Sequence, residues 1–264
     1  TVADSRPQTA ESTIQDQLRS RGVDVLPGFT IRSARGSGRV SEAQLVPSDD
    51  STFGNSEVVV SCDFIAVSAG FDPITSLVAQ GSSTVGYDHY LRESVPQRLE
   101  EGYFAIGDVT GIHDVAIGVD QGDLTASKIV STVNGEARCN ITSDIVNLGS
   151  LVSEKERLYR ANMVANNNLI VKGGNRKKFV CICEDVTEKD LHWAIAEGFD
   201  EMQTLKRYST TSMGPCQGKM CLKSLAEICA QVTGKTISET GTTTSRPPAQ
   251  PVPMGVIAGP GHMP

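Results

Sequence analysis

The stretch FVCICEDVTEKDLHWAIAEGFDEMQTLKRYSTTSMGPCQGKMC, residues 179–221, contains four of the seven cysteines of the chain. Cys181 and Cys183 form a Cys-x-Cys pair near its start, and Cys216 and Cys221 form a Cys-x4-Cys pair at its end. Thiolates are soft ligands, and proteins generally bring four of them together for zinc or for an iron–sulfur cluster. The spacing therefore predicts one four-thiolate site, with a small domain built around it.

The residues between and after the two pairs predict a helical unit. Thr187 followed by Asp190 is typical of a capping box that opens a helix, and Gly198 is placed to end that helix. After Cys221, apolar residues recur at helical spacing. Cys221 is thus expected near a helix start, where free N–H groups favour a negatively charged group.

Three other interpretations of the cysteines compete. A zinc knuckle usually has at least one Cys-x2-Cys pair, and neither pair here has that spacing. Disulfides need an oxidising compartment, which nothing in the sequence indicates. Buried structural cysteines would not explain the close pairing within glycine-rich turns. Iron–sulfur chemistry is favoured, and zinc stays open as the alternative.

Cys62, Cys139 and Cys229 lie outside the pairs. Cys229 follows Cys221 by eight residues, which is about 12 Å along a helix at about 1.5 Å per residue. Metal–thiolate bonds are only about 2.3 Å long. We therefore expect none of these three cysteines to bind the metal.

The segments CICEDVT, residues 181–187, and MGPCQGKMC, residues 213–221, resemble the bacterioferritin-associated-ferredoxin-like 2Fe-2S domain. With its flanking sequence, the chain is similar to alpha-type subunits of heteromeric sarcosine, opine and proline oxidising flavoenzymes and of hydrogen cyanide synthase. The resemblance implies that Cys181, Cys183, Cys216 and Cys221 ligate one 2Fe-2S cluster. The chain departs from the small ferredoxin in one respect, because its second pair is Cys-x4-Cys where the ferredoxin has Cys-x2-Cys.

Two further motifs suggest dinucleotide binding. Gly107 and Asp108 end an apolar segment, 102–106, that predicts a strand, and they resemble the second flavin motif of glutathione-reductase-like flavoproteins. There the Asp accepts a hydrogen bond from the ribityl chain, and the next helix points its N-terminus at the cofactor. Asp4 and Arg6 follow a short strand, where an acidic residue holds a ribose and an arginine can meet a 2′-phosphate. A plain surface turn explains Asp4 and Arg6 equally well.

The rest of the first 100 residues alternates helix and strand patterns. The periodicity predicts a helix at 11–21, strands at 23–26, 40–46 and 57–60, and an apolar strand running from Cys62 towards Pro73. This last strand resembles the exit strand of a nicotinamide-nucleotide subdomain. The chain has no Gly-x-Gly-x-x-Gly loop, and flavoproteins of this class carry one for each dinucleotide. We therefore expect the C-terminal part of a longer alpha-type subunit.

The predicted fold class is α/β, an incomplete two-dinucleotide flavoprotein core of the glutathione-reductase type followed by a small helical 2Fe-2S domain. The expected boundaries are 1–95 for the remainder of the nicotinamide-type subdomain, 96–150 for the C-terminal part of the FAD domain, 151–174 for a connector, 175–237 for the 2Fe-2S domain and 238–264 for an extended Pro/Gly-rich arm.

The composition and charge of the chain limit the classes of function that are expected. The chain has 264 residues, 39% of them hydrophobic, with a net charge of −7 and a pI near 5.2. An acidic chain without a basic patch is not expected to bind nucleic acid. No apolar stretch approaches the roughly 20 residues that span a bilayer, and no signal peptide is evident. We expect a cytoplasmic protein.

The resemblance implies an electron-transferring subunit of an FAD-dependent oxidoreductase that acts on a secondary amine or amino acid of sarcosine, proline or opine type. The implied cofactors are a 2Fe-2S cluster, FAD or NAD in the equivalent site, and FMN at a subunit interface. The implied partners are an amine-oxidase-like flavoprotein beta subunit and the missing N-terminal part of the alpha-type one. The alternative is a non-catalytic scaffold with a structural zinc site.

Overall fold

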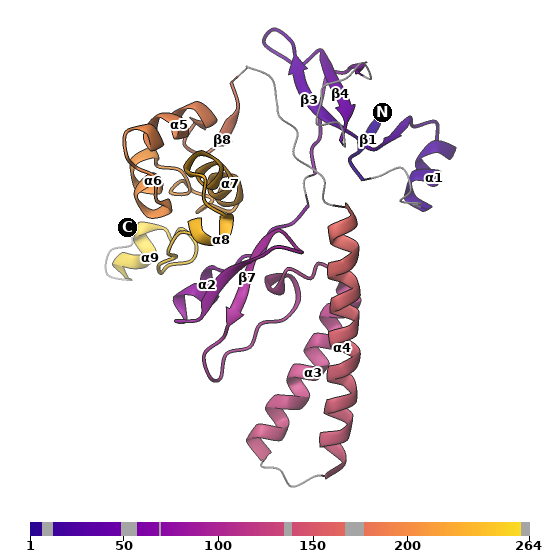
Figure 1. The fold of residues 1–264 in the computed structure, drawn as a ribbon, viewed down its shortest axis with the longest axis vertical. Helices are drawn as coiled ribbons and strands as arrows, with labels where there is room; N and C mark the ends of the chain where they lie inside the picture. The colour runs from indigo at the N-terminus through magenta and orange to yellow at the C-terminus, as the bar shows by residue number, and fades with distance from the viewer. Residues whose placement is uncertain (7–12, 49–56, 69, 135–138, 167–176, 260–264) are drawn as a thin grey trace. The chain divides into compact units, whose positions relative to one another are not determined.

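A computed structural model describes residues 1–6, 13–48, 57–68, 70–134, 139–166 and 177–259. The chain divides into two compact units, one made of Thr1–Gly70 with Ala161–Arg176 and the other of Phe71–Arg160 with Lys177–Pro264. The architecture is mixed α/β, with helices and several small sheets (Figure 1). Among the described helices, none has the length and apolar character needed to cross a membrane.

The first unit begins with a strand, a helix and a second strand. β1 (Val2–Asp4) pairs in parallel with β2 (Val25–Pro27), and α1 (Thr13–Ser20) connects them. Parallel strands need such a crossover connection. The predicted helix and short strand are confirmed, and Asp4 lies at the carboxyl end of β1 as expected.

An antiparallel sheet follows, with β4 (Glu42–Pro47) between β3 (Phe29–Arg35) and β5 (Val58–Ser61). The central strand carries the buried apolar side chains of this unit's sheet, Ala43, Leu45 and Val46. The strands predicted at 40–46 and 57–60 are confirmed within two residues.

The second unit opens with α2 (Ser76–Gln80) and the antiparallel hairpin of β6 (Thr84–Asp88) and β7 (Glu93–Arg98). The 3-10 helix η1 (Gly107–Thr110) then leads into α3 (Val115–Asn134) and α4 (Cys139–Asn166).

The helices α3 and α4 lie side by side (Figure 1). Gln121 of α3 donates a 2.8 Å hydrogen bond to Glu156 of α4, and Lys155 pairs with Asp120. Leu124 of α3 is buried, and a Cβ built on Gly149 of α4 would lie 3.8 Å from its Cδ1, so an apolar contact accompanies the polar ones.

The cysteine domain combines a two-stranded ribbon with three helices. The ribbon is β8 (Phe179–Cys181) with β9 (Val186–Thr187), and the helices are α5 (Glu188–Ala196), α6 (Met202–Ser209) and α7 (Leu222–Thr233). Their core is apolar and includes the fully buried side chains of Leu191, Leu205 and Leu225. The predicted capping box is confirmed, since the Thr187 hydroxyl accepts from the Asp190 N–H and the Asp190 carboxylate accepts from the Thr187 N–H.

The C-terminal segment contains α8 (Ile237–Thr240) and α9 (Met254–Ala258), with no helix or strand at 241–253. Side-chain hydrogen bonds attach it to the rest of the second unit. Thr244 accepts from Gln203 at 2.8 Å, and Ser245 accepts from Gln80 at 3.2 Å.

Two predicted strands are absent. Residues 62–68, 70–73 and 103–106 form no strand in the described chain, and the side chains of Phe64, Val67 and Phe104 are exposed. A strand needs a neighbour to satisfy its backbone hydrogen bonds. No described strand pairs with either segment, so both strand predictions are wrong for this chain.

The segment expected as a connector, 151–174, is helical in its first part. The helix α4 continues to Asn166, and residues 167–174 lie outside the described residues.

Candidate functional site

The four paired cysteines come from two segments of the cysteine domain, 181–183 and 216–221. Cys181 ends β8, Cys183 lies in the turn before β9, Cys216 lies in the loop between α6 and α7, and Cys221 is the residue that precedes α7. Cys181 and Cys221 are fully buried, Cys216 is half-buried and Cys183 is exposed. The four thiols thus extend from the core of the domain to its surface.

Tight turns bring these segments together. Asp185 turns the β8–β9 ribbon with a left-handed φ of 53°. Gly214 lies against the same turn, because a Cβ built on it would be 2.5 Å from the Cys183 Cβ and 2.8 Å from Glu184 Oε1. Only glycine lets the two cysteine-bearing loops approach this closely.

The outer thiols, those of Cys183 and Cys216, shift each other's pKa. The Cys216 backbone N–H lowers the pKa of Cys183, but the Cys216 thiol, burial and the charge of Cys181 together raise it. Burial raises the pKa of Cys216, but hydrogen bonds from the N–H groups of Met220, Gly218 and Lys219 and from the Cys183 thiol lower it overall. The loop between α6 and α7 therefore directs several backbone N–H donors at the Cys216 sulfur, as the binding of an anionic group requires.

The inner thiols, those of Cys181 and Cys221, form a second interacting pair. Burial, followed by the charge of Cys181 and a hydrogen bond with its thiol, raises the pKa of Cys221 to about 12. The charge of Cys216 also acts on Cys221. All four thiols therefore belong to one electrostatic network.

The thiols hydrogen-bond as two pairs, Cys183 with Cys216 and Cys181 with Cys221. Within the described residues, no group of three or more His, Cys, Asp or Glu side chains has the geometry to hold one metal ion. The described cysteines are all free thiols. Four soft donors arranged as two pairs fit a two-iron cluster, in which two thiolates bind each iron.

The other cysteines lie in other elements of the chain. Cys229 is buried in the helical core and donates to the Asp200 carbonyl at 3.5 Å. Cys62 is half-buried in the first unit. Cys139 begins α4. Cys229 is thus engaged in the core of the cysteine domain, and that none of these three cysteines shares the site stays a prediction.

Gly107 and Asp108 begin η1, in front of α3. The Gly107 N–H donates to Gln121 Oε1 at 2.7 Å, and Gly107 has a left-handed φ of 68°. A Cβ on Gly118 would lie 3.6 Å from the Gly107 Cα, so the start of α3 passes close to the turn. The Asp108 side chain is 82% exposed and is available to a ligand hydroxyl.

His113 and Glu93, two residues that sequence reasoning missed, adjoin this turn. His113 Nδ1 lies 3.3 Å from Asp108 Oδ1, and its Nε2 lies 3.2 Å from Glu93 Oε2. Burial raises the pKa of Glu93, partly offset by His113. The Tyr159 hydroxyl accepts from the His113 N–H at 3.2 Å. These contacts hold Asp108 beside the His113 imidazole. No short sequence motif predicts them, because Glu93 lies 20 residues before His113 in the sequence.

Asp4 and Arg6 pair with each other in the first unit. Arg6 Nε and Nη2 donate to the Asp4 carboxylate at 2.9 and 2.6 Å, and Gln15 Nε2 donates to it at 2.8 Å. The Arg6 hydrogen bond lowers the pKa of Asp4 to about 2. The Asp4 carboxylate and the Arg6 guanidinium therefore already have each other as hydrogen-bonding partners, as expected for a turn with a structural role.

Residues 175–260 match the family model of the sarcosine oxidase A3 domain. Hydrogen cyanide synthase subunit HcnB of Pseudomonas aeruginosa is 25% identical over 251 residues, covering 91% of this chain and 53% of HcnB. The alpha subunit of sarcosine oxidase from Corynebacterium is 25% identical over 261 residues, covering 98% of this chain and 26% of that protein. The A subunit of opine oxidase from Rhizobium meliloti is 33% identical over 78 residues, 30% of this chain and 17% of that protein.

The crystal structure of L-proline dehydrogenase from P. horikoshii shares the fold, with a TM-score of 0.63, 19% identity and coverage of 92% of this chain and 47% of that chain. The chain spans about half the length of HcnB and less of the other relatives. Residues 175–260 form a domain of the sarcosine oxidase A3 family, in a chain related to the alpha-type subunits of sarcosine oxidase, hydrogen cyanide synthase and opine oxidase.

Proposed function

We propose that the chain is an electron-transferring subunit, or part of one, of a heteromeric flavin-dependent oxidoreductase, and that Cys181, Cys183, Cys216 and Cys221 hold its 2Fe-2S cluster. The observation that carries the proposal is the network of two thiol pairs in the A3 domain. The relatives named as oxidase subunits support the reaction class.

The burial of the thiols suits electron transfer. When bound, a 2Fe-2S cluster accepts and donates single electrons. Cys181 and Cys221 would hold the iron on the core side, where burial excludes water. Cys183 is exposed and would bring the other side within reach of a redox partner. The backbone N–H groups around Cys216 would stabilise the cluster's negative charge.

Gly107 and Asp108 are proposed as part of a dinucleotide site, for FAD or for NAD in the equivalent place. Asp108 would accept a hydrogen bond from a ligand hydroxyl, and the start of α3 would face the ligand. The remaining contacts would come from the N-terminal part of the alpha-type protein. Asp4 and Arg6 stay a weaker proposal for ribose and 2′-phosphate contacts because they satisfy each other.

The substrate is proposed to be a secondary amine or amino acid of sarcosine, proline or opine type, as the names of the relatives suggest. Its carbon–nitrogen bond would be oxidised in an amine-oxidase-like flavoprotein beta subunit, with FMN at the interface. The free thiols suit the reducing cytoplasm.

Metal analysis after anaerobic purification tests the proposal. We expect visible absorbance together with two irons and two inorganic sulfides per chain, the composition of a 2Fe-2S cluster. Stoichiometric zinc without iron would instead support the alternative, a non-catalytic scaffold with a structural zinc site made by the four cysteines.

A further inference from the structure

The helices α5 and α6, with the turn between them, carry a row of aromatic side chains that we call the aromatic surface: Trp193, Phe199 and Tyr208, joined through Glu197. The Glu197 N–H donates to the Trp193 carbonyl at 3.0 Å, and residues four apart lie on one face of a helix. The Tyr208 hydroxyl donates to the Glu197 carboxylate. The Phe199 and Tyr208 rings stack with their centroids 3.9 Å apart. These contacts make the aromatic surface continuous.

The aromatic surface faces water although the domain has a buried core of its own. Trp193 and Tyr208 are 57% and 51% exposed, whereas Leu191 and Leu205 of the same two helices are fully buried. The helices therefore do not need the two rings for their packing. Exposed tryptophan and tyrosine side chains are typical of protein-binding surfaces, because they supply a large contact area at a small cost in conformational entropy.

Acidic side chains adjoin the aromatic surface. Glu197 belongs to it, Asp200 and Glu201 follow in the turn before α6, and all three residues are exposed. Within the part of the chain that the structure describes, none of these three carboxylates forms an ion pair. Lys189 lies at the other end, with its Nζ 4.4 Å from the centroid of the Trp193 ring. A ligand for this surface should therefore combine apolar rings with a positive charge.

The C-terminal segment contains this combination. Residues 246–253 read RPPAQPVP, with four prolines behind one arginine. Proline-rich segments bind to aromatic side chains, because proline rings pack on flat aromatic faces and the restricted backbone loses little entropy on binding. Arg246 supplies the positive charge, and a guanidinium pairs well with a carboxylate such as that of Glu197.

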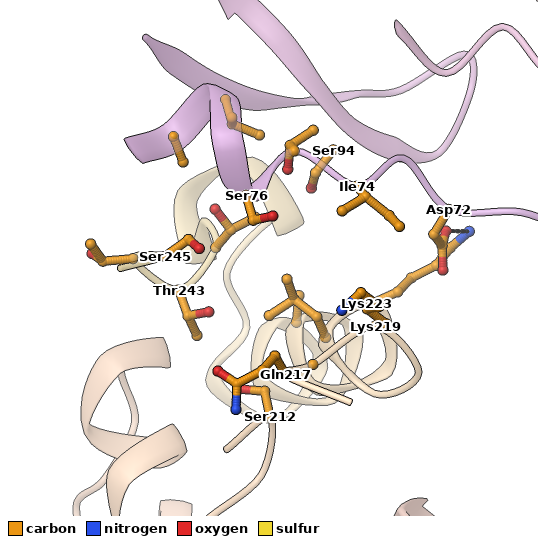
Figure 2. Close-up of a pocket in the computed structure, with 18 of the residues that line it drawn as sticks. Asp72, Ile74, Ser76, Ser94, Ser212, Gln217, Lys219, Lys223, Thr243 and Ser245 are labelled. Atoms are coloured by element: carbon orange, nitrogen blue, oxygen red, sulfur yellow. Dashed lines mark hydrogen bonds and ion pairs between the residues drawn. The ribbon is translucent and has the colours of Figure 1, made fainter. Parts of the chain in front are cut away.

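The start of this segment is held beside a cavity in its own chain. The cavity has a volume of about 590 Å³ and lies within the second unit, where it is lined by the α2 and β6–β7 region, by parts of α6 and α7 and by residues 242–251. Figure 2 shows Thr243 and Ser245 along one side of it. The hydrogen bonds of Thr244 with α6 and of Ser245 with α2 anchor the segment there.

Beyond Ser245 the segment is open to a second molecule. In the described chain, the side chains of residues 246–253 form no hydrogen bond or ion pair, and all of these residues except Ala249 are exposed. Trp193 and Tyr208 are not among the residues that line the cavity with 246–251. The segment of a chain is thus held away from the aromatic surface of the same chain, so the occupant of that surface comes from another copy.

We propose that the aromatic surface binds the proline-rich segment, 246–253, of a second copy of this chain. The proline rings lie on Trp193 and Tyr208, and Arg246 pairs with Glu197. Because the segment and the surface are different parts of one chain, two copies that exchange segments make the contact twice. The proposal goes beyond the proposed function and holds whether the thiols bind iron or zinc.

Trp193 is the only tryptophan in the sequence, so its fluorescence reports on the aromatic surface. The first test titrates the full 264-residue chain with a synthetic peptide of residues 245–254. We expect the fluorescence to change with a dissociation constant below about 300 μM, as for a small interface. A peptide with its four prolines replaced by alanine, and one with Arg246→Ala, should each bind at least about fivefold more weakly.

Sedimentation of the chain itself tests whether a second copy is the occupant. We expect self-association at chain concentrations up to about 300 μM, in the presence of a reductant so that no disulfide links the copies. Trp193→Ala removes a ring, and Glu197→Gln removes the charge but keeps an acceptor for Tyr208. Each should weaken self-association at least about fivefold. Tyr90→Ala, at an exposed aromatic residue of the β6–β7 turn, is the matched control and should associate like the unmodified chain.

The proposal is overturned if the peptide does not bind below about 1 mM, a weak affinity, or if the alanine peptide binds as tightly. It is overturned equally if the chain stays monomeric at about 300 μM, or if folded Trp193→Ala and Tyr90→Ala associate alike, with folding checked by circular dichroism. Metal content, measured on the same samples, reports separately on the cysteine site.

Discussion

At the scale of single residues, the candidate site depends on a glycine and on backbone N–H groups as well as on the four thiols. Gly214 touches the Cys183 turn, and backbone N–H groups of residues 218–220 converge on Cys216. The two cysteine pairs are evident in the sequence. Their partition into Cys183 with Cys216 and Cys181 with Cys221 is not, because it depends on how two loops meet.

Gly214→Ala should weaken the site. The new Cβ would lie 2.5 Å from the Cys183 Cβ, so the loops must separate. We expect a loss of about 1–3 kcal/mol in unfolding free energy and a lower metal content, measured by denaturant unfolding and elemental analysis. Gly255→Ala is the control, since a Cβ at Gly255 meets nothing within 4 Å. Equal stability of the two variants would contradict the close approach.

Asp4 gives a pH-dependent contribution to stability. Its pKa is lowered from 3.8 to about 2, chiefly by the Arg6 hydrogen bond. A folded pKa below the unfolded one stabilises the protein above about pH 4, and this stabilisation is lost as the pH falls towards 2. Allowing for solvent screening, it amounts to about 1 kcal/mol.

Asp4→Asn should therefore unfold more easily than the unmodified chain at pH 5–7, and the difference should shrink below pH 4. Denaturant titrations across this range measure it. Asp16→Asn removes a pair with Arg19 whose Asp side chain is 78% exposed, and it should change stability little. A difference for Asp4→Asn that persists at pH 2 would argue against the ion pair as its cause.

At the scale of elements, the cysteine domain follows its local sequence closely. The capping box of Thr187 and Asp190 starts α5, Gly198 follows its end, and α7 begins directly after Cys221.

Thr187→Ala should cost about 1 kcal/mol in unfolding free energy, the usual value of a cap. Thr236→Ala removes the same motif from α8, which has four residues and buries none of them. It should cost less, and a larger loss there would contradict this account of α5.

Elements that depend on distant partners were harder to predict. The apolar runs at 62–73 and 102–106 have strand-like composition, but pattern alone does not supply a neighbouring strand. The cavity is equally invisible in the sequence. Ile74, Ser212 and Thr243 meet in it, and no local motif connects residues so far apart along the chain. The paired cysteines and Gly107–Asp108 are visible as candidates in the sequence because their signals are short-range.

At the scale of the whole molecule, the chain matches about half or less of the length of its relatives. Asp108 offers one exposed carboxylate, whereas the pyrophosphate of FAD needs a glycine-rich loop at a helix N-terminus. We therefore expect the purified 264-residue chain to carry no tightly bound FAD. Perchloric acid extraction and chromatography check this, and stoichiometric FAD in the extract would refute the description of Gly107–Asp108 as part of a site.

The central claim is that four named thiols hold one 2Fe-2S cluster. Its most direct test is a set of single Cys→Ser changes at all seven cysteines, purified anaerobically and scored by iron content and visible spectrum, with circular dichroism to confirm folding. We predict loss of the cluster spectrum for the variants at positions 181, 183, 216 and 221, and its retention for those at 62, 139 and 229. Loss of the cluster in folded Cys229→Ser, or full retention in Cys221→Ser, would contradict the account.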